Sequence, residues 1–225
     1  MRNSYVYRKI NQMENMSFSI TLFIVIMTGI LSYQAFGNHS MKSRMLFIPD
    51  VVYRMKQYDR FLTHGFIHAD WMHLLINLFV LYQFGEIAEW YFKEAFGASV
   101  GAILYTVLYI GGIVVSSIPS YVKHKENRMY AALGASGAVS AVVFVNIFFD
   151  PWNILYLYLF IPIPIVLAGI LYLWYSDYMG KKGNDNIGHD AHFYGAVWGF
   201  SFTVLSAVIL RPDLLTRFMD MLLFR

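Results

Sequence analysis

The chain has 225 residues, of which 58% are hydrophobic and 14% charged, whereas soluble domains average about 45–50% apolar and roughly 25% charged residues. This balance indicates a membrane protein and excludes disordered, collagen-like and DNA-binding classes. The formal net charge of +3 is small and spread over loops, which suits lipid headgroups better than nucleic acid. Because the chain contains no cysteine, any chemistry must come from oxygen or imidazole groups.

Long uncharged segments predict the membrane spans. Five intervals between charged residues can each hold the ~20 residues that cross a bilayer, and a weaker sixth span ends with Glu86 and Glu89. We therefore predict an all-α membrane protein, a bundle of six transmembrane helices in a single domain over residues 1–225. The predicted helices cover residues 17–36, 71–92, 95–118, 131–149, 153–176 and 191–210. The polar start lacks a small-residue cleavage site, so we expect the first helix to be retained.

The connection between the first two helices is too long for an ordinary loop. It runs from about Gly37 to Asp70, and we expect it to be partly embedded in the membrane interface. Pro49 opens a stretch with apolar residues at helical spacing, which predicts an interfacial helix; a solvated surface loop is the alternative. These apolar positions are Val51, Val52, Met55, Tyr58 and Leu62. The connection between the last two helices, residues 180–188, is rich in glycine and asparagine, so we expect it to be mobile.

Unusual polar residues stand at the start of three predicted helices. His68 and His73 precede or begin the second helix, Ser136 begins the fourth, and His192 begins the sixth. Even-numbered helices of such a bundle enter the membrane from the same side, so these side chains share one face and a similar depth. Polar groups at such depth are usually functional or internally paired.

Ser136 has the setting of a nucleophile. It lies in a predicted N-terminal turn, where its own N–H has no helical partner and can face an incoming oxyanion. Gly134 and Gly137 flank it, which lets a substrate backbone come close. By itself this run would indicate only helix packing.

His192 supplies a candidate base for that nucleophile. The sixth helix carries Gly195 and Gly199, a G-x-x-x-G face that lets it approach another helix closely. At that distance the imidazole can reach a serine hydroxyl. Taken alone, His192 would be an ordinary interfacial histidine.

The second helix offers oxyanion donors. His73 and Asn77 are four residues apart and share a helix face, and each donor is worth on the order of 3–4 kcal/mol of transition-state stabilisation. A zinc site is the rival reading, since clustered imidazoles bind zinc. Its ligands would come from His64, His68, His73, His189 and His192. We expect no metal and no cofactor, because no carboxylate stands in H-E-x-x-H register with them and Ser136 would lack a role.

These motifs resemble, in their order along the chain, those of the rhomboid family of intramembrane serine proteases. The matching segments are His68-(4)-His73-(3)-Asn77, Gly134-Ala-Ser-Gly137 and Ala191-His192-x-x-Gly195-(3)-Gly199. The resemblance spans helices 2 to 6, and the three motifs together are specific. It implies a six-helix bundle, a Ser–His dyad, a cavity open to the non-cytoplasmic side, and cleavage of peptide bonds in or beside another protein's transmembrane segment.

The resemblance also implies residue roles. Ser136 would be the nucleophile and His192 the general base, with His73, Asn77 and the Ser136 N–H forming the oxyanion hole. Supporting positions would be His68, Gly134, Gly137, Gly195 and Gly199, and structural ones residues 63–68, Arg60 and Glu89. Substrate would enter between helices 2 and 5, where Pro162 and Pro164 are expected to kink helix 5.

Two positions depart from the family pattern. Asp59 stands where the family usually has a tryptophan, and Ser140 stands where it often has a tyrosine packed on the catalytic imidazole. We expect the Ser140 hydroxyl to bond its own backbone carbonyl rather than His192. The imidazole would then be positioned by Phe193, Tyr194 or a ring of the fifth helix.

The expected function is that of a serine endopeptidase acting on transmembrane proteins within the lipid bilayer. We expect no nucleic-acid partner, and the sequence predicts no particular oligomeric state. The resemblance favours a multi-pass protein of a bacterial inner membrane with both termini in the cytoplasm, although the Lys and Arg counts of the two sides are too similar to fix the orientation. The alternatives are a catalytically silent rhomboid-like protein that binds membrane clients and a histidine-cluster metal hydrolase. A transporter is disfavoured, because helices 4 to 6 become apolar beyond their first turns.

Overall fold

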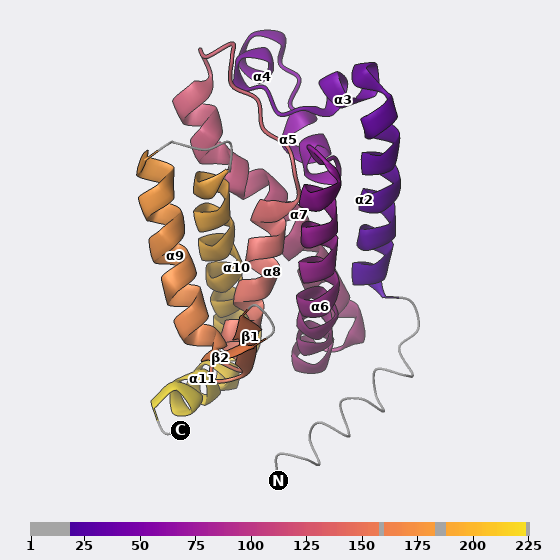
Figure 1. Cartoon of the computed structure of the whole chain (residues 1–225). Coiled ribbons are helices and arrows are strands. Elements are labelled where there is room, and N and C mark those ends of the chain that lie inside the picture. The colour runs from indigo at the N-terminus through magenta and orange to yellow at the C-terminus, as the bar shows by residue number, and fades with distance from the viewer. Residues whose placement is uncertain (1–18, 158–159, 183–187, 224–225) are drawn as a thin grey trace.

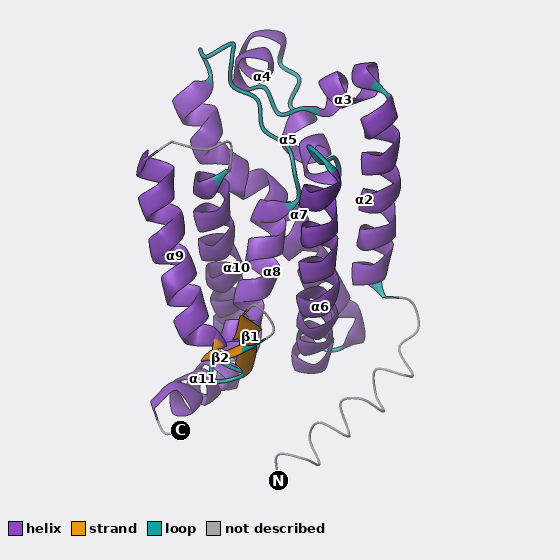
Figure 2. Ribbon diagram, viewed as in Figure 1, coloured by secondary structure: helices purple, strands orange, loops and turns teal. Residues whose placement is uncertain are grey.

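The computed structural model describes residues 19–157, 160–182 and 188–223, which fold mainly into helices (Figure 2). Each of the six predicted ranges contains a helix. They are α2 (Ile20–Gly37), α6 (Trp71–Phe96), α7 (Ala98–His124), α8 (Ser136–Phe149), α9 (Ile165–Lys182) and α10 (His189–Leu210). In Figure 1 the start of α2 lies at the same end of the bundle as the last helix, α11 (Asp213–Leu223).

Length and composition give fewer membrane spans than six within the described residues. Three helices, α2, α7 and α10, are each long and apolar enough to cross a membrane. A fourth candidate joins residues 60–66 to α6 across a bend of 93°. The apolar α8 has only 14 residues, and α9 carries charges near its end. The count of six spans therefore stays a prediction.

The predicted helix 153–176 is wrong in its first third. Residues in this stretch form an antiparallel hairpin, β1 (Ile154–Leu157) and β2 (Ile161–Pro164), in which Ile154 pairs with Pro164. The expected helix kink at Pro162 and Pro164 is therefore also wrong, because both prolines lie in β2. Proline lacks the N–H that a helix interior needs but is tolerated at a strand edge, so the helix starts only after them and the fold is not purely α-helical.

The predicted helix 131–149 begins five residues late, at Ser136. Gly134 has a φ of +116°, a left-handed conformation that a helix cannot contain. At 1.5 Å per residue, the 14 residues of α8 span about 21 Å, less than the ~30 Å of a bilayer core. α8 alone is therefore too short to cross such a core, and in Figure 1 its start, which is Ser136, lies deeper inside the bundle than the nearby ends of α2 and α7.

The long first connection folds into short helices at the end of the bundle opposite α11 (Figure 1). They are α3 (His39–Met45), α4 (Pro49–Met55), α5 (Arg60–Thr63) and the 3-10 turn η1 (His64–Phe66). A helix does begin at Pro49, as predicted, but it ends at Met55 because Lys56 adopts a left-handed φ of 57°. The expected mobility of the 180–188 connection concerns mainly residues 183–187, which lie outside the described residues.

Arg60 anchors this connection. Its guanidinium is buried and donates to the carbonyl oxygens of Ser43 at 2.9 Å and Leu46 at 2.6 Å. Its neighbour Asp59 pairs with Arg44 at 2.6 Å, and that guanidinium holds the pKa of the Asp59 carboxyl below its usual range. The segment is thus held by the buried Arg60, and an exposed ion pair stands where the family that the motifs resemble usually has tryptophan.

At the other end of the bundle, Glu89 ties α2 to α6. This carboxylate is fully buried and accepts from the backbone N–H groups of Ile20 at 3.1 Å and Thr21 at 2.8 Å. It therefore caps the first turn of α2 from another helix, and Lys93 neutralises it at 2.5 Å. A buried charge with these partners fits the structural role that the resemblance implies for Glu89.

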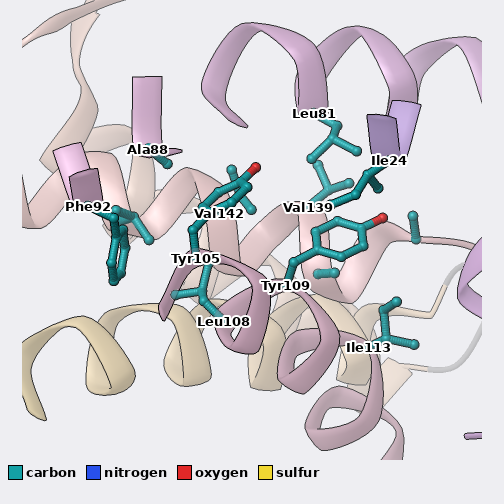
Figure 3. Packing of buried hydrophobic residues seen from close by; sticks show 13 residues of the cluster. Ile24, Leu81, Ala88, Phe92, Tyr105, Leu108, Tyr109, Ile113, Val139 and Val142 are labelled. Atoms are coloured by element: carbon teal, nitrogen blue, oxygen red, sulfur yellow. The ribbon is translucent and has the colours of Figure 1, made fainter. Parts of the chain in front are cut away.

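The central helix α8 is packed on several sides. Apolar side chains of α2, α6, α7 and α8 make one core (Figure 3). The residues labelled there are Ile24, Leu81, Ala88, Phe92, Tyr105, Leu108, Tyr109, Ile113, Val139 and Val142.

Glycines bring α10 into backbone contact with α8. A Cβ atom built at Gly195 would lie 2.1 Å from the carbonyl oxygen of Gly137, and one at Gly199 would lie 2.1 Å from that of Ala141. Since no side chain fits into such gaps, the close approach predicted from the G-x-x-x-G spacing is present.

We expect Gly199→Ala to lower the free energy of unfolding by about 1–3 kcal/mol, because the new methyl group must push two backbones apart. Gly29→Ala in α2 is the matched control, since its Cβ would meet only a side-chain atom, of Leu78, at 3.6 Å. That control should be neutral or stabilising by up to about 1 kcal/mol. Thermal unfolding in detergent micelles measures both, and equal stability of the two variants would contradict the contact.

Candidate active site

The chain leading into α8 is held by the first connection. Phe47 and Ala132 exchange both backbone hydrogen bonds, at 3.0 and 2.9 Å. Two residues later, the Gly134 N–H donates to the carbonyl oxygen of His64 at 2.9 Å. Phe47 and His64 thus hold the chain just before Ser136 through backbone hydrogen bonds, contacts that no local sequence pattern indicates.

His68 bonds the next backbone N–H group along the chain, that of Ala135. It is fully buried, and its Nε2 accepts from the Ala135 N–H at 3.4 Å while its Nδ1 lies 3.0 Å from the Ser32 hydroxyl. That hydroxyl donates to the Phe66 carbonyl oxygen, so it must accept from Nδ1, which therefore carries the proton. His68 is a neutral link between α2 and the turn before Ser136.

His73 lies directly against the same turn. Asp70 caps the start of α6 by accepting from the His73 N–H at 2.9 Å. A Cβ atom at Gly134 would lie 2.8 Å from His73 Cε1 and 3.0 Å from its Nε2, so only glycine allows this contact. One turn further along α6, the buried Asn77 donates to the His73 carbonyl oxygen at 2.9 Å, which uses one of its two amide N–H groups.

Ser136 and His192 stand on facing turns of α8 and α10. A Cβ atom at Gly195, one turn after His192, would lie 2.1 Å from the carbonyl oxygen of Gly137, the neighbour of Ser136, so the backbones of these two turns are in close contact. Both candidate side chains are half-buried. Ser136 is the first residue of α8, where backbone N–H groups have no partner within the helix.

Aromatic rings surround His192. The ring of Tyr172 on α9 stacks on the imidazole, with a centroid distance of 6.1 Å and an interplanar angle of 20°. His189 meets it edge-on at 6.0 Å. Phe193 and Tyr194, the other predicted candidates, contact each other. The ring of the fifth helix is therefore the one that stacks on His192.

The expectation for Ser140 is wrong. Its hydroxyl bonds the Tyr172 hydroxyl at 2.6 Å instead of its own backbone carbonyl. The two residues are 32 positions apart, so periodicity along one helix could not reveal the pair.

The histidines do not assemble a metal centre within the described part of the chain, where no group of three or more His, Asp or Glu side chains could hold an ion. Two of the suggested ligands are engaged elsewhere. His68 is bonded at both nitrogens, and His64 bonds Arg60 O through Nδ1 at 2.9 Å and the Ser117 hydroxyl through Nε2 at 3.1 Å. These contacts argue against the metal alternative.

Sequence comparison agrees with the motifs: the profile of the Rhomboid domain matches residues 55–208, so the chain belongs to the rhomboid family. It is 33% identical to RHOMBOID-like protein 12, mitochondrial, of Arabidopsis thaliana over an alignment of 144 residues. This alignment covers 60% of this chain and 42% of that protein. It is 32% identical over 80 residues to presenilin-associated rhomboid-like protein A, mitochondrial, of Danio rerio, which covers 35% of this chain and 19% of that protein. The chain thus spans less than half the length of these relatives.

We expect His68→Phe to lower the free energy of unfolding by about 2–4 kcal/mol, because it leaves the Ala135 N–H without an acceptor in the interior and removes the bond that Nδ1 donates to the Ser32 hydroxyl. His39→Phe, at an exposed position on α3, is the control and should stay within about 0.5 kcal/mol. Chemical denaturation in micelles compares them. A His68 variant as stable as the control would show that the bridge contributes nothing.

Proposed function

We propose that this protein is an intramembrane serine protease with Ser136 as nucleophile and His192 as general base. The observation that carries the proposal is the close backbone approach of Gly195 to Gly137, which sets the first turns of α8 and α10 against each other. Membership in the rhomboid family supports it.

The mechanism follows from these positions. The Ser136 hydroxyl attacks the scissile carbonyl carbon while His192 takes its proton. The backbone N–H of Ser136 and the side chains of His73 and Asn77 on α6 donate hydrogen bonds to the oxyanion. His192 then protonates the leaving amine, and water activated by the same imidazole hydrolyses the acyl-enzyme. No metal or cofactor enters any step.

The recessed start of α8 suggests the substrate class. A peptide bond must descend to that depth, so the substrates are transmembrane proteins cleaved in or beside their membrane segments. α6 and α9 lie on opposite sides of α8 in Figure 1 and would flank the entering segment. The matched relatives are named as mitochondrial proteins, which gives no support to the bacterial membrane expected from the sequence.

Co-expression with a panel of single-span substrates tests the dyad. Ser136→Ala and His192→Ala should each abolish cleavage in folded protein, and the double variant should be no worse than either, because the two residues act as one unit. Ser206→Ala is the control, since this buried serine of α10 bonds its own helix at Phe202 O. A double variant measurably slower than both single ones contradicts the dyad.

Labelling with a fluorophosphonate separates the protease from a silent binding protein. The parent chain and Ser206→Ala should be labelled, and Ser136→Ala should not. An unlabelled parent that still captures membrane proteins would favour the silent alternative.

Asn77→Ala should lower kcat by roughly 100-fold with little change in KM, because its second N–H acts mainly on the transition state. The matched control is Asn146→Ala, which removes a similarly buried amide near the other end of α8, bonded to Phe84 O at 3.2 Å. Kinetics per folded enzyme compare the two. An unchanged kcat in Asn77→Ala would remove this residue from the site.

A further inference from the structure

The stacked ring on His192 comes from a helix that the family pattern does not predict for it. Position 140 lies one turn below Ser136 on α8 and carries a small side chain. Tyr172 of α9 reaches across to that position and fills it, with its ring on the imidazole and its hydroxyl on Ser140. One side chain thus bonds α8 at its tip and supports His192 with its face.

This arrangement restricts the imidazole in two ways. The near-parallel Tyr172 ring lies against the His192 imidazole and limits its rotation, in the offset-stacked arrangement that aromatic pairs prefer. The 2.6 Å hydrogen bond between the Tyr172 and Ser140 hydroxyls in turn holds the tip of that ring against α8.

Few side chains of α9 are buried, which makes the contact of Tyr172 with α8 more important for the position of this helix. Most large side chains of this helix are exposed, among them Ile170 and Trp174 at 58% and 65%. Buried positions of α9 are Ile165, Gly169 and Ser176. Tyr172 lies between Gly169 and Ser176 in the sequence and adds a hydrogen bond to α8. The packing of α9 on α8 therefore determines the position of the Tyr172 ring.

We propose that Tyr172, held by Ser140, is the positioning residue for His192, so that the general base is aligned from α9. The proposal rests on the proposed protease function. Tyr172 touches no reacting atom; it acts through the imidazole.

An exchange of the two side chains provides the test. Tyr172→Ser removes the ring and should lower kcat roughly 10- to 100-fold at unchanged KM, because a misaligned base slows the chemical step. Tyr172→Phe keeps the ring and should lose less than about tenfold. The double variant Ser140→Tyr with Tyr172→Ser returns a ring from α8 and should recover to within about tenfold of the parent. Tyr178→Ser is the control, because that ring on the same helix stacks on Trp174 instead.

The outcomes separate the possibilities. An unchanged kcat in Tyr172→Ser overturns the proposal, as does a loss that the exchange fails to restore while thermal stability falls in parallel, which would mean that Tyr172 only holds α9. The imidazole resonance of His192, measured by NMR in micelles, needs no activity: its ring-current shift should vanish in Tyr172→Ser and return in the exchange. If Ser136→Ala is as active as the parent, the proposed function fails, and this resonance still decides whether Tyr172 positions His192.

Discussion

The contact of two backbones, without side chains between them, is the constraint on which the rest of this structure depends. At Gly195 and Gly199 the backbone of α10 lies against that of α8, closer than any Cβ atom permits. Gly112 does the same for α7, where a Cβ would lie 2.9 Å from the Cα atom of Ala138. In lipid, such packing replaces a hydrophobic driving force between helices. It also sets the distance between the turns that carry Ser136 and His192.

A second constraint follows from the first. Because α8 is short and central, its first turn and the residues 132–135 before it lie inside the bundle, where protein must satisfy their backbone groups. The first connection supplies those partners through Phe47, His64 and His68. In the proposed mechanism the next N–H, that of Ser136, is the one kept for the substrate. The connection is therefore part of the site, although none of its residues is assigned a chemical step.

The sequence predicted the features that depend on composition and short spacing. Uncharged intervals located the helices, and glycine spacing foretold the contact of α8 with α10. The features that it missed do not follow from the spacing of apolar residues. The hairpin ending at Pro164 pairs residues four to ten apart, the turn at Lys56 needs a left-handed backbone that no pattern of apolar residues predicts, and Tyr172 meets Ser140 only because two helices pack. Local patterns specify elements, whereas such contacts arise from their assembly.

The exchange of a ring between helices has a steric logic. A small residue at 140 leaves the space that Tyr172 fills, and a tyrosine there would exclude it, so the two positions must change together. Gly169, one turn before Tyr172, lets α9 come close enough, since a Cβ there would meet Ile147 at 2.5 Å. An imidazole that stacks on a ring from α8 keeps its orientation even when α9 moves. An imidazole that stacks on a ring from α9 changes its orientation when α9 moves, so its alignment depends on every contact that packs α9 against α8.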